Sequence, residues 1–246
     1  ATKLSIYSSV TIVGRSMAPF LVGLLISLAS FGAVYIACAL SGVLALLAGV
    51  LLPGDTRVAP PRGAVPRFWK SLRGVLRDRR IMLTSLVEAA QYLVFGAVEA
   101  FLAVYAAALG IPAWQIGVIL GVQLVSIVFV KPLMGNMSDR IGRKRVIIPG
   151  RLLGAASVAL LPVLPYFSGL MVLSLLFGIG FAAVTSSTSA LVADYTKNGA
   201  YGSSMGVLST LMDVGQSIGP PLTGWVIGYY GYTDAFLMLA VVLLVS

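Results

Sequence analysis

The chain has 246 residues, of which 59% are hydrophobic and only 10% are charged. An ordinary soluble domain is roughly 45–50% apolar and about 25% charged, so this composition excludes a water-soluble fold and favours a chain that faces lipid. The sequence has no histidine and one cysteine, Cys38. These counts exclude Ser-His-Asp catalysis, histidine-bearing zinc sites and an intramolecular disulfide. No nucleophile and base are recognisable together, so we expect neither an enzyme nor a bound metal or cofactor.

Apolar stretches long enough to cross a bilayer need about 20 residues each. We predict eight of them, at residues 8–29, 33–52, 81–107, 115–134, 146–165, 169–193, 204–228 and from about 232 to the end. The last has only about 15 residues before the chain stops, which we interpret as a truncation. The sequence therefore predicts an all-α, multi-pass membrane protein.

The basic residues separate the loops into two sets. Lys and Arg number 17, and fourteen of them lie at the N-terminus or in the loops that follow the second, fourth and sixth spans. The other loops have none. Because cytoplasmic loops are enriched in Lys and Arg, this pattern places both chain ends and these three loops in the cytoplasm. It also accounts for the net charge of +9, so we expect no nucleic-acid partner.

The first and seventh spans repeat one another. Residues 13–26, VGRSMAPFLVGLLI, align without gaps on residues 214–227, VGQSIGPPLTGWVI. The offset covers six helices, which predicts a duplicated six-helix half. The first span would then be the fifth helix of a half whose first four helices are missing.

The loop over residues 53–80 combines prolines, basic residues and apolar residues at helical spacing. Phe68, Leu72, Val75 and Leu76 share one face. This pattern predicts an amphipathic helix that lies on the anionic inner leaflet, with membrane lipids as partners. A solvated basic linker is the alternative.

The span over 81–107 has polar residues on one face, spaced at helical intervals: Glu88, Gln91, Tyr92 and Glu99. Burying a charged side chain in a membrane costs at least ~2.5–3.5 kcal/mol, so such a stripe cannot face lipid. We expect it to line a substrate or water cavity. Carboxylates paired inside the bundle without substrate are the alternative.

The segment GNMSDRIGRKR over residues 135–145 has the sharpest motif, formed by Gly135, Asp139, Arg140, Gly142, Arg143 and Lys144. This spacing resembles the cytoplasmic loop signature of the major facilitator superfamily. Gly135 would permit close backbone approach and Gly142 a tight turn. We also expect Asp139 to act as a conformational latch at the N-terminus of the first span, near Ser8 and Ser9.

The resemblance implies the major facilitator fold, with eight transmembrane helices present out of twelve. Residues 1–52 would hold the last two helices of the first half, residues 53–80 the inter-half loop, and residues 81–246 the second half. The repeated segments resemble the glycine-proline motif of the family's efflux antiporters, through Pro19, Gly23, Gly219, Pro220 and Gly224. Ala18 and Val22 stand where that motif has glycine. Simple helix packing is the alternative.

The span over 204–228 has Asp213 near its middle, with Gln216 on the same face. A carboxyl group at this depth could bind a proton reversibly, and a neutral Asp bonded between helices is the alternative. Arg15 lies at mid-depth in the first span and needs an acidic partner. Lys131 and Arg151 are close enough to the cytoplasmic ends to extend to the headgroups. Thr185–Ser189 could face a cavity or bond to backbone carbonyls.

These features predict a secondary active transporter of the plasma membrane, in bacteria the inner membrane, that works by alternating access. We expect proton-coupled efflux of small amphipathic or cationic solutes, with a proton gradient rather than a cofactor as the driving force. A proton-coupled importer of a nutrient or metabolite is the alternative, and a non-transporting receptor or scaffold is a weaker one. The missing helices of the first half would be required partners, so we expect no transport by these residues alone.

Overall fold

The computed structural model describes residues 18–28, 31–50, 72–196 and 200–246 of the chain, and their regular structure is helical. The helices are Ala18–Leu28, α2 (Phe31–Val50), a short helix over 72–77, α4 (Arg79–Ala108), α5 (Ala113–Ile141), α6 (Arg143–Leu160), α7 (Phe167–Tyr195) and α8 (Tyr201–Val245). Gly231 interrupts α8 with a φ of 86°, so α8 consists of two spans. A helix therefore lies at each of the eight predicted positions, which confirms the all-α membrane architecture.

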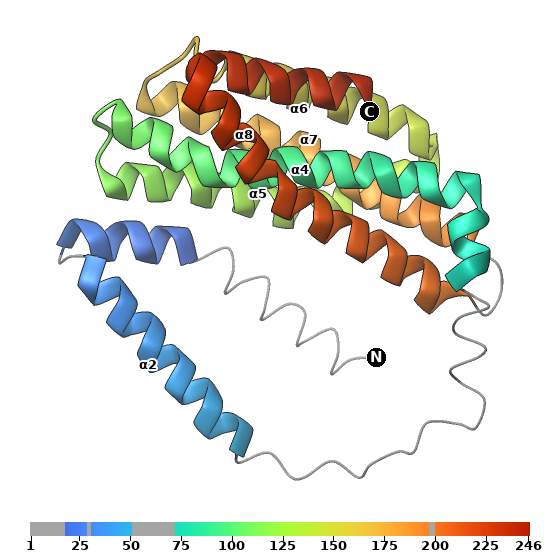
Figure 1. Cartoon of the computed structure of the whole chain (residues 1–246), viewed down its shortest axis with the longest axis horizontal. Coiled ribbons are helices and arrows are strands. Elements are labelled where there is room, and N and C mark those ends of the chain that lie inside the picture. Colours follow the sequence, from blue (N-terminus) through green and yellow to red (C-terminus); the bar gives the residue numbers. More distant parts are fainter. Residues whose placement is uncertain (1–17, 29–30, 51–71, 197–199) are drawn as a thin grey trace.

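Helices α4 to α8 form one bundle (Figure 1). Helix α4 packs along α8, α5 packs along α7, and α6 packs against both α7 and α8. Five of the described helices are long and apolar enough to cross a membrane. Helix α2 lies away from the bundle in Figure 1, and its apolar length is exposed. Large apolar side chains on its surface, such as Tyr35 and Leu46, are what a lipid-facing helix requires.

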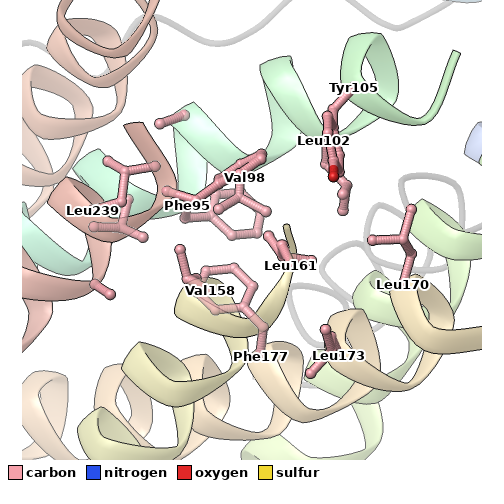
Figure 2. Packing of buried hydrophobic residues seen from close by; sticks show 14 of the residues in the cluster. Phe95, Val98, Leu102, Tyr105, Val158, Leu161, Leu170, Leu173, Phe177 and Leu239 are labelled. Carbon is pink, nitrogen blue, oxygen red and sulfur yellow. The ribbon is translucent and has the colours of Figure 1, made fainter. Parts of the chain in front are cut away.

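The bundle interior contains a large apolar cluster to which α4, α5, α6, α7 and α8 all contribute. Figure 2 shows Phe95 and Leu102 from α4 facing Val158 from α6, Phe177 from α7 and Leu239 from α8. In lipid the hydrophobic effect gives little force between helices, so close packing holds such a core together. This cluster fixes the positions of α4 and α7, between which the candidate site lies.

The basic segments meet at one end of the bundle. The guanidinium of Arg80, at the start of α4, lies 5.8 Å from the ring centre of Tyr195 at the end of α7. Arg143, at the start of α6, forms an ion pair of 3.2 Å with Asp194 in the last turn of α7. The starts of α4 and α6 thus lie beside the end of α7, as the charge pattern predicts. That this end faces the cytoplasm stays a prediction.

The helix over 72–77 is placed differently from the prediction for residues 53–80. Val75 is 3% exposed and packs with Ile81, Val192, Val207 and Leu208 of the bundle. The apolar face is therefore docked at least partly on protein, because the adjoining ends of α4, α7 and α8 offer an apolar surface. Residues 53–71 of that prediction, with Phe68, lie outside the described residues.

Helix α5 is longer than predicted. It continues through the motif to Ile141, so residues 135–141 are its last turns rather than a loop. Only Gly142 separates α5 from α6, and its φ of 98° is one that glycine adopts readily. Gly142 thus forms the tight turn between the two helices. A Cβ built on Gly135 would meet no atom of the described residues within 4 Å, so the close approach expected there stays a prediction.

The helix Ala18–Leu28 packs across α5. A Cβ built on Gly23 would lie 2.8 Å from the carbonyl oxygen of Ala113, and one built on Gly117 would lie 2.6 Å from the carbonyl oxygen of Pro19. Both glycines are buried, so the two backbones approach each other closely. The Pro19–Gly23 segment therefore acts in helix packing in this structure.

Candidate functional site

Glu88 is the most enclosed acidic residue that the structure describes. Its side chain is 0% exposed and lies between α4 and α7. Oε2 of the carboxyl group contacts Oγ1 of Thr188. The sequence singled out this hydroxyl but could not assign it an acidic partner.

The Thr188 hydroxyl has a second acceptor within reach. Its oxygen lies 2.9 Å from the carbonyl oxygen of Val184. A hydroxyl group has one proton to donate and two lone pairs to accept with. It can donate to Val184 and accept from a protonated Glu88, whereas an ionised Glu88 and the carbonyl would compete for the one proton. With Glu88 protonated, both contacts of Thr188 can be hydrogen bonds at the same time.

Other buried polar side chains lie on the same two helices. Gln91 is 1% exposed, and its amide oxygen and nitrogen have no hydrogen-bond partner among the described residues. Within the same part of the chain, the hydroxyls of Ser85, Thr185 and Ser187 are also buried without partners. Buried polar groups are normally satisfied, so this cluster is suited to bound water or to rearrangement of the helices.

Aromatic side chains close this polar cluster on one side. Tyr92 packs edge-on against Phe181 with ring centres 5.1 Å apart, and Phe95 packs on Phe181 at 4.5 Å. Glu88 and Gln91 are thus shut off inside the bundle rather than facing an open cavity as predicted. The reason is that α7 lies directly on this face of α4.

Glu99 lies eleven residues, or about three turns, after Glu88 on the same face of α4, and it is partly exposed. The aromatic pair around Phe95 lies between it and Glu88 along the helix, so the structure does not bring the two carboxylates together. Glu99 remains a separate candidate for contact with a solute.

Asp213 is exposed on α8, which packs on a different face of α4 from the one that carries Glu88. Gly215 and Gly219 of α8 pack directly on the backbone of Ala89 and Leu93 of α4. This register places Asp213 at nearly the same height as Glu88. Asp213 itself is exposed, because the side of α8 that packs on α4 is the one with the glycines.

Gln216 and the proline motif of α8 accompany Asp213. A Cβ built on Gly96 would lie 2.6 Å from the carbonyl oxygen of Gln216, so Gln216 lies where α8 crosses α4. Pro220 is partly buried, and Gly224 faces the ring of Phe101. The second motif therefore packs α8 on α4, and the first packs the helix Ala18–Leu28 on α5.

Arg143 is the centre of the 135–145 motif. It forms an ion pair with Asp139 one turn earlier, donates to Oγ of Ser138 at 2.8 Å and reaches Asp194 at 3.2 Å. Its side chain is 18% exposed, whereas Asp139 is 59% exposed. One guanidinium thus joins the ends of α5 and α7 to the start of α6. Arg140 and Lys144 are exposed.

Asp194 was missed by the sequence reasoning. The available signal was an acidic residue in the last turn of a span that ends at the same side as the basic motif. Arg15, Ser8 and Ser9 lie outside the described residues, so neither the partner of Arg15 nor the proposed contact of Asp139 is tested. Arg151 donates to the carbonyl oxygen of Leu243 at 2.9 Å and so holds the last turn of α8.

A sequence profile of the Major Facilitator Superfamily matches residues 84–246, which is well over half of the chain. The chain belongs to this superfamily. Its family is one of transporters rather than enzymes, and the match includes α5 with the 135–145 motif and both spans of α8.

Two related proteins of the superfamily are named for export or resistance. The chain is 28% identical over 143 residues to the multi-drug resistance efflux pump PmrA of Streptococcus pneumoniae, covering 56% of this chain and 36% of PmrA. It is 26% identical over 134 residues to the quinolone resistance protein NorA of Staphylococcus aureus, covering 54% of this chain and 34% of NorA. The matches thus span about a third of the length of each relative.

A solved structure of the same fold is that of a nucleoside transporter. The chain superposes on a crystal structure of the nucleoside transporter NupG, a D323A mutant, with a TM-score of 0.79 and 18% identity. The match covers 95% of this chain and 63% of NupG. At this identity it shows the fold alone, which is the fold of a major facilitator transporter.

Proposed function

We propose that the protein exports small amphipathic or cationic solutes in exchange for protons by alternating access. The observation that carries this proposal is the contact between Glu88 and Thr188. It involves a fully buried carboxyl group beside a hydroxyl that can accept a hydrogen bond from its protonated form, at the boundary of two helices. An ionisable residue in such a position is expected to have a function rather than a packing role.

Alternating access gives this proton site its role. In major facilitator transporters one six-helix half rocks against the other around a midplane site. Glu88 would take up a proton when the site faces one side and lose it when rearrangement of α4 and α7 admits water from the other. Asp213, level with Glu88 but on the bundle surface, would act where the solute or the other half approaches.

The named relatives favour export. PmrA is an efflux pump and NorA a quinolone resistance protein, and the acidic residues Glu88, Glu99 and Asp213 would favour cationic over anionic solutes. The fold match to the nucleoside transporter NupG supports the second candidate, import of a nutrient or metabolite. Cells that lack the protein would accumulate the solute in the first case and fail to acquire it in the second.

Efflux of a fluorescent lipophilic cation from cells that express the complete protein tests this proposal. We expect efflux that stops when an ionophore collapses the proton gradient, and that Glu88→Gln abolishes. Asp234→Asn is the matched control, because Asp234 is an exposed carboxylate in the second span of α8, just after Gly231. Efflux unaffected by both the ionophore and Glu88→Gln would contradict proton coupling at this site.

A further inference from the structure

Lys131 has a different orientation from the one that its depth in α5 predicts. Leu120, Leu124 and Ile127 of α5 pack against the buried core of the bundle. Lys131 follows them by 11, 7 and 4 residues, so at 100° per residue it lies within about 40° of each of them around the helix. The side chain therefore starts toward the bundle interior rather than toward the headgroups.

Two contacts fix the height of Lys131 against α7. Gly178 of α7 lies against Ser126 and Gln123 of α5, and Asp194 near the end of α7 pairs with Arg143 just beyond the end of α5. Helices α5 and α7 thus run side by side in the same direction. Counted from these two contacts at 1.5 Å per residue, Lys131 lies about 5 to 9 Å, or one to two helical turns, from the level of Thr188.

The height of Thr188 is also the height of Glu88. Oγ1 of Thr188 contacts Glu88 from α4, so Glu88 and Lys131 approach the same level of α7 from two other helices. Lys131 is partly buried and Glu88 is fully buried at this level of the bundle.

We propose that Lys131 is the internal counter-ion of Glu88 and positions it for proton exchange. In the described structure Glu88 contacts Thr188, and no ion pair within 4.0 Å joins it to Lys131. When Glu88 loses its proton to water, the ammonium group of Lys131 extends to the carboxylate and neutralises it. When a proton returns to Glu88, the ammonium is released. The carboxylate is thus neutralised either by a bound proton or by the ammonium group of Lys131, but not by both at once.

The structure gives a physical reason for such an exchange. A buried carboxylate without a cation is costly in an apolar medium, and breaking a buried pair is far more harmful than removing both partners. A lysine has a flexible four-carbon stem with three donor protons, so it can extend toward the carboxylate and withdraw again. This inference rests on the proposed function for its use in transport, but the pairing itself can be tested without transport.

The first test measures how reactive Lys131 is toward a membrane-permeant acetylating ester, by mass spectrometry of the complete protein in membranes. Lys144 is the internal reference, because it is an exposed lysine of the neighbouring helix. In Glu88→Gln we expect acetylation of Lys131 to rise about fivefold relative to Lys144, the ratio that one kcal/mol of lost pairing gives. Asp213→Asn, which neutralises the other acid at this height, should leave the ratio unchanged.

An unchanged ratio in Glu88→Gln would overturn the proposal, as would a rise caused by Asp213→Asn instead. If Glu88→Gln does not accumulate in the membrane, the reciprocal measurement uses Lys131→Met and a hydrophobic carbodiimide, which modifies protonated carboxyl groups. Glu88 should then be modified faster than in the wild type and at the wild-type rate in Lys131→Arg, which keeps the cation. Equal rates in Lys131→Met and the wild type would contradict the pairing.

These readouts separate the inference from the proposed function. If Lys131 and Glu88 are coupled but efflux does not depend on protons, the proposed function fails and the pair is structural. If efflux depends on protons and Glu88 but the two side chains react independently, the proposed function stands and the role of Lys131 is refuted.

Discussion

At the scale of single residues, the positions that matter are those whose partners come from other helices. Glu88 was recognisable from its depth and its place on a polar stripe. Its partner Thr188 was not, because sequence does not show which face of α7 meets α4. Lys131 was placed by depth alone as a residue that reaches the headgroups. Its spacing from Leu124 and Ile127 would have indicated the inward face instead.

Arg143 carries the first residue-scale prediction. Replacing it with lysine should weaken the joint between α5, α6 and α7, since an ammonium group cannot match the forked contacts to Asp139, Ser138 and Asp194. Because the pair with Asp194 is partly exposed, the loss should be about 1 kcal/mol or less. Thermal unfolding in detergent checks this, with Lys144→Met as the control. A stability equal to the wild type in Arg143→Lys would show that charge alone suffices.

The second residue-scale prediction concerns Asp213 and Glu99. Asp213→Asn in the complete protein should abolish proton-driven transport and leave solute exchange or binding partly intact, because it keeps the shape of the side chain and removes its charge. Glu99→Gln should weaken transport of cationic solutes more than of neutral ones. Solute-dependent proton flux at wild-type levels in both variants would refute these roles.

At the scale of elements, the order of the helices was predictable because each span is a long apolar stretch bounded by basic or glycine-rich turns. The ends of the helices were less predictable from the sequence. Helix α5 extends to Ile141 because polar residues at a membrane surface remain compatible with helix. The helix over 72–77 docks through Val75, a contact that depends on the bundle ends and not on its own amphipathic pattern.

The crossing of the helix Ala18–Leu28 over α5 gives an element-scale prediction. Gly117→Val should separate the two helices, because its Cβ would lie 2.6 Å from the carbonyl oxygen of Pro19. Overpacking of this kind costs typically 1–3 kcal/mol. The thermal unfolding temperature in detergent should therefore fall in this variant. Gly42→Val is the control, since a Cβ built on Gly42 meets no atom of the described residues within 4 Å. An equal unfolding temperature in both variants would contradict the close approach.

At the scale of the whole molecule, the charge pattern predicts which end of the bundle faces the cytoplasm. The starts of α4 and α6 and the end of α7 are at one end of the bundle, and the basic residues gather there. We therefore predict that this end is cytoplasmic. The division into 1–52, 53–80 and 81–246 also stays a prediction, although the family match begins at residue 84, just inside the third segment.

Single-cysteine labelling tests the orientation. In a Cys38→Ala background, a cysteine at position 108, at the far end of α4, should react with an impermeant reagent added outside intact cells. A cysteine at position 144 should react only after the membrane is opened, because it lies at the basic end. Labelling of position 144 in intact cells would reverse the topology.

Solute-driven proton movement in proteoliposomes that hold the complete protein tests the central claim most directly, with a pH-sensitive dye trapped inside. Addition of a transported lipophilic cation to one side should move protons in the opposite direction, and the signal should vanish in Glu88→Gln but persist in Asp234→Asn. Solute transport without any proton movement, or an equal proton signal in Glu88→Gln, would contradict the account of Glu88 as the buried site of proton exchange.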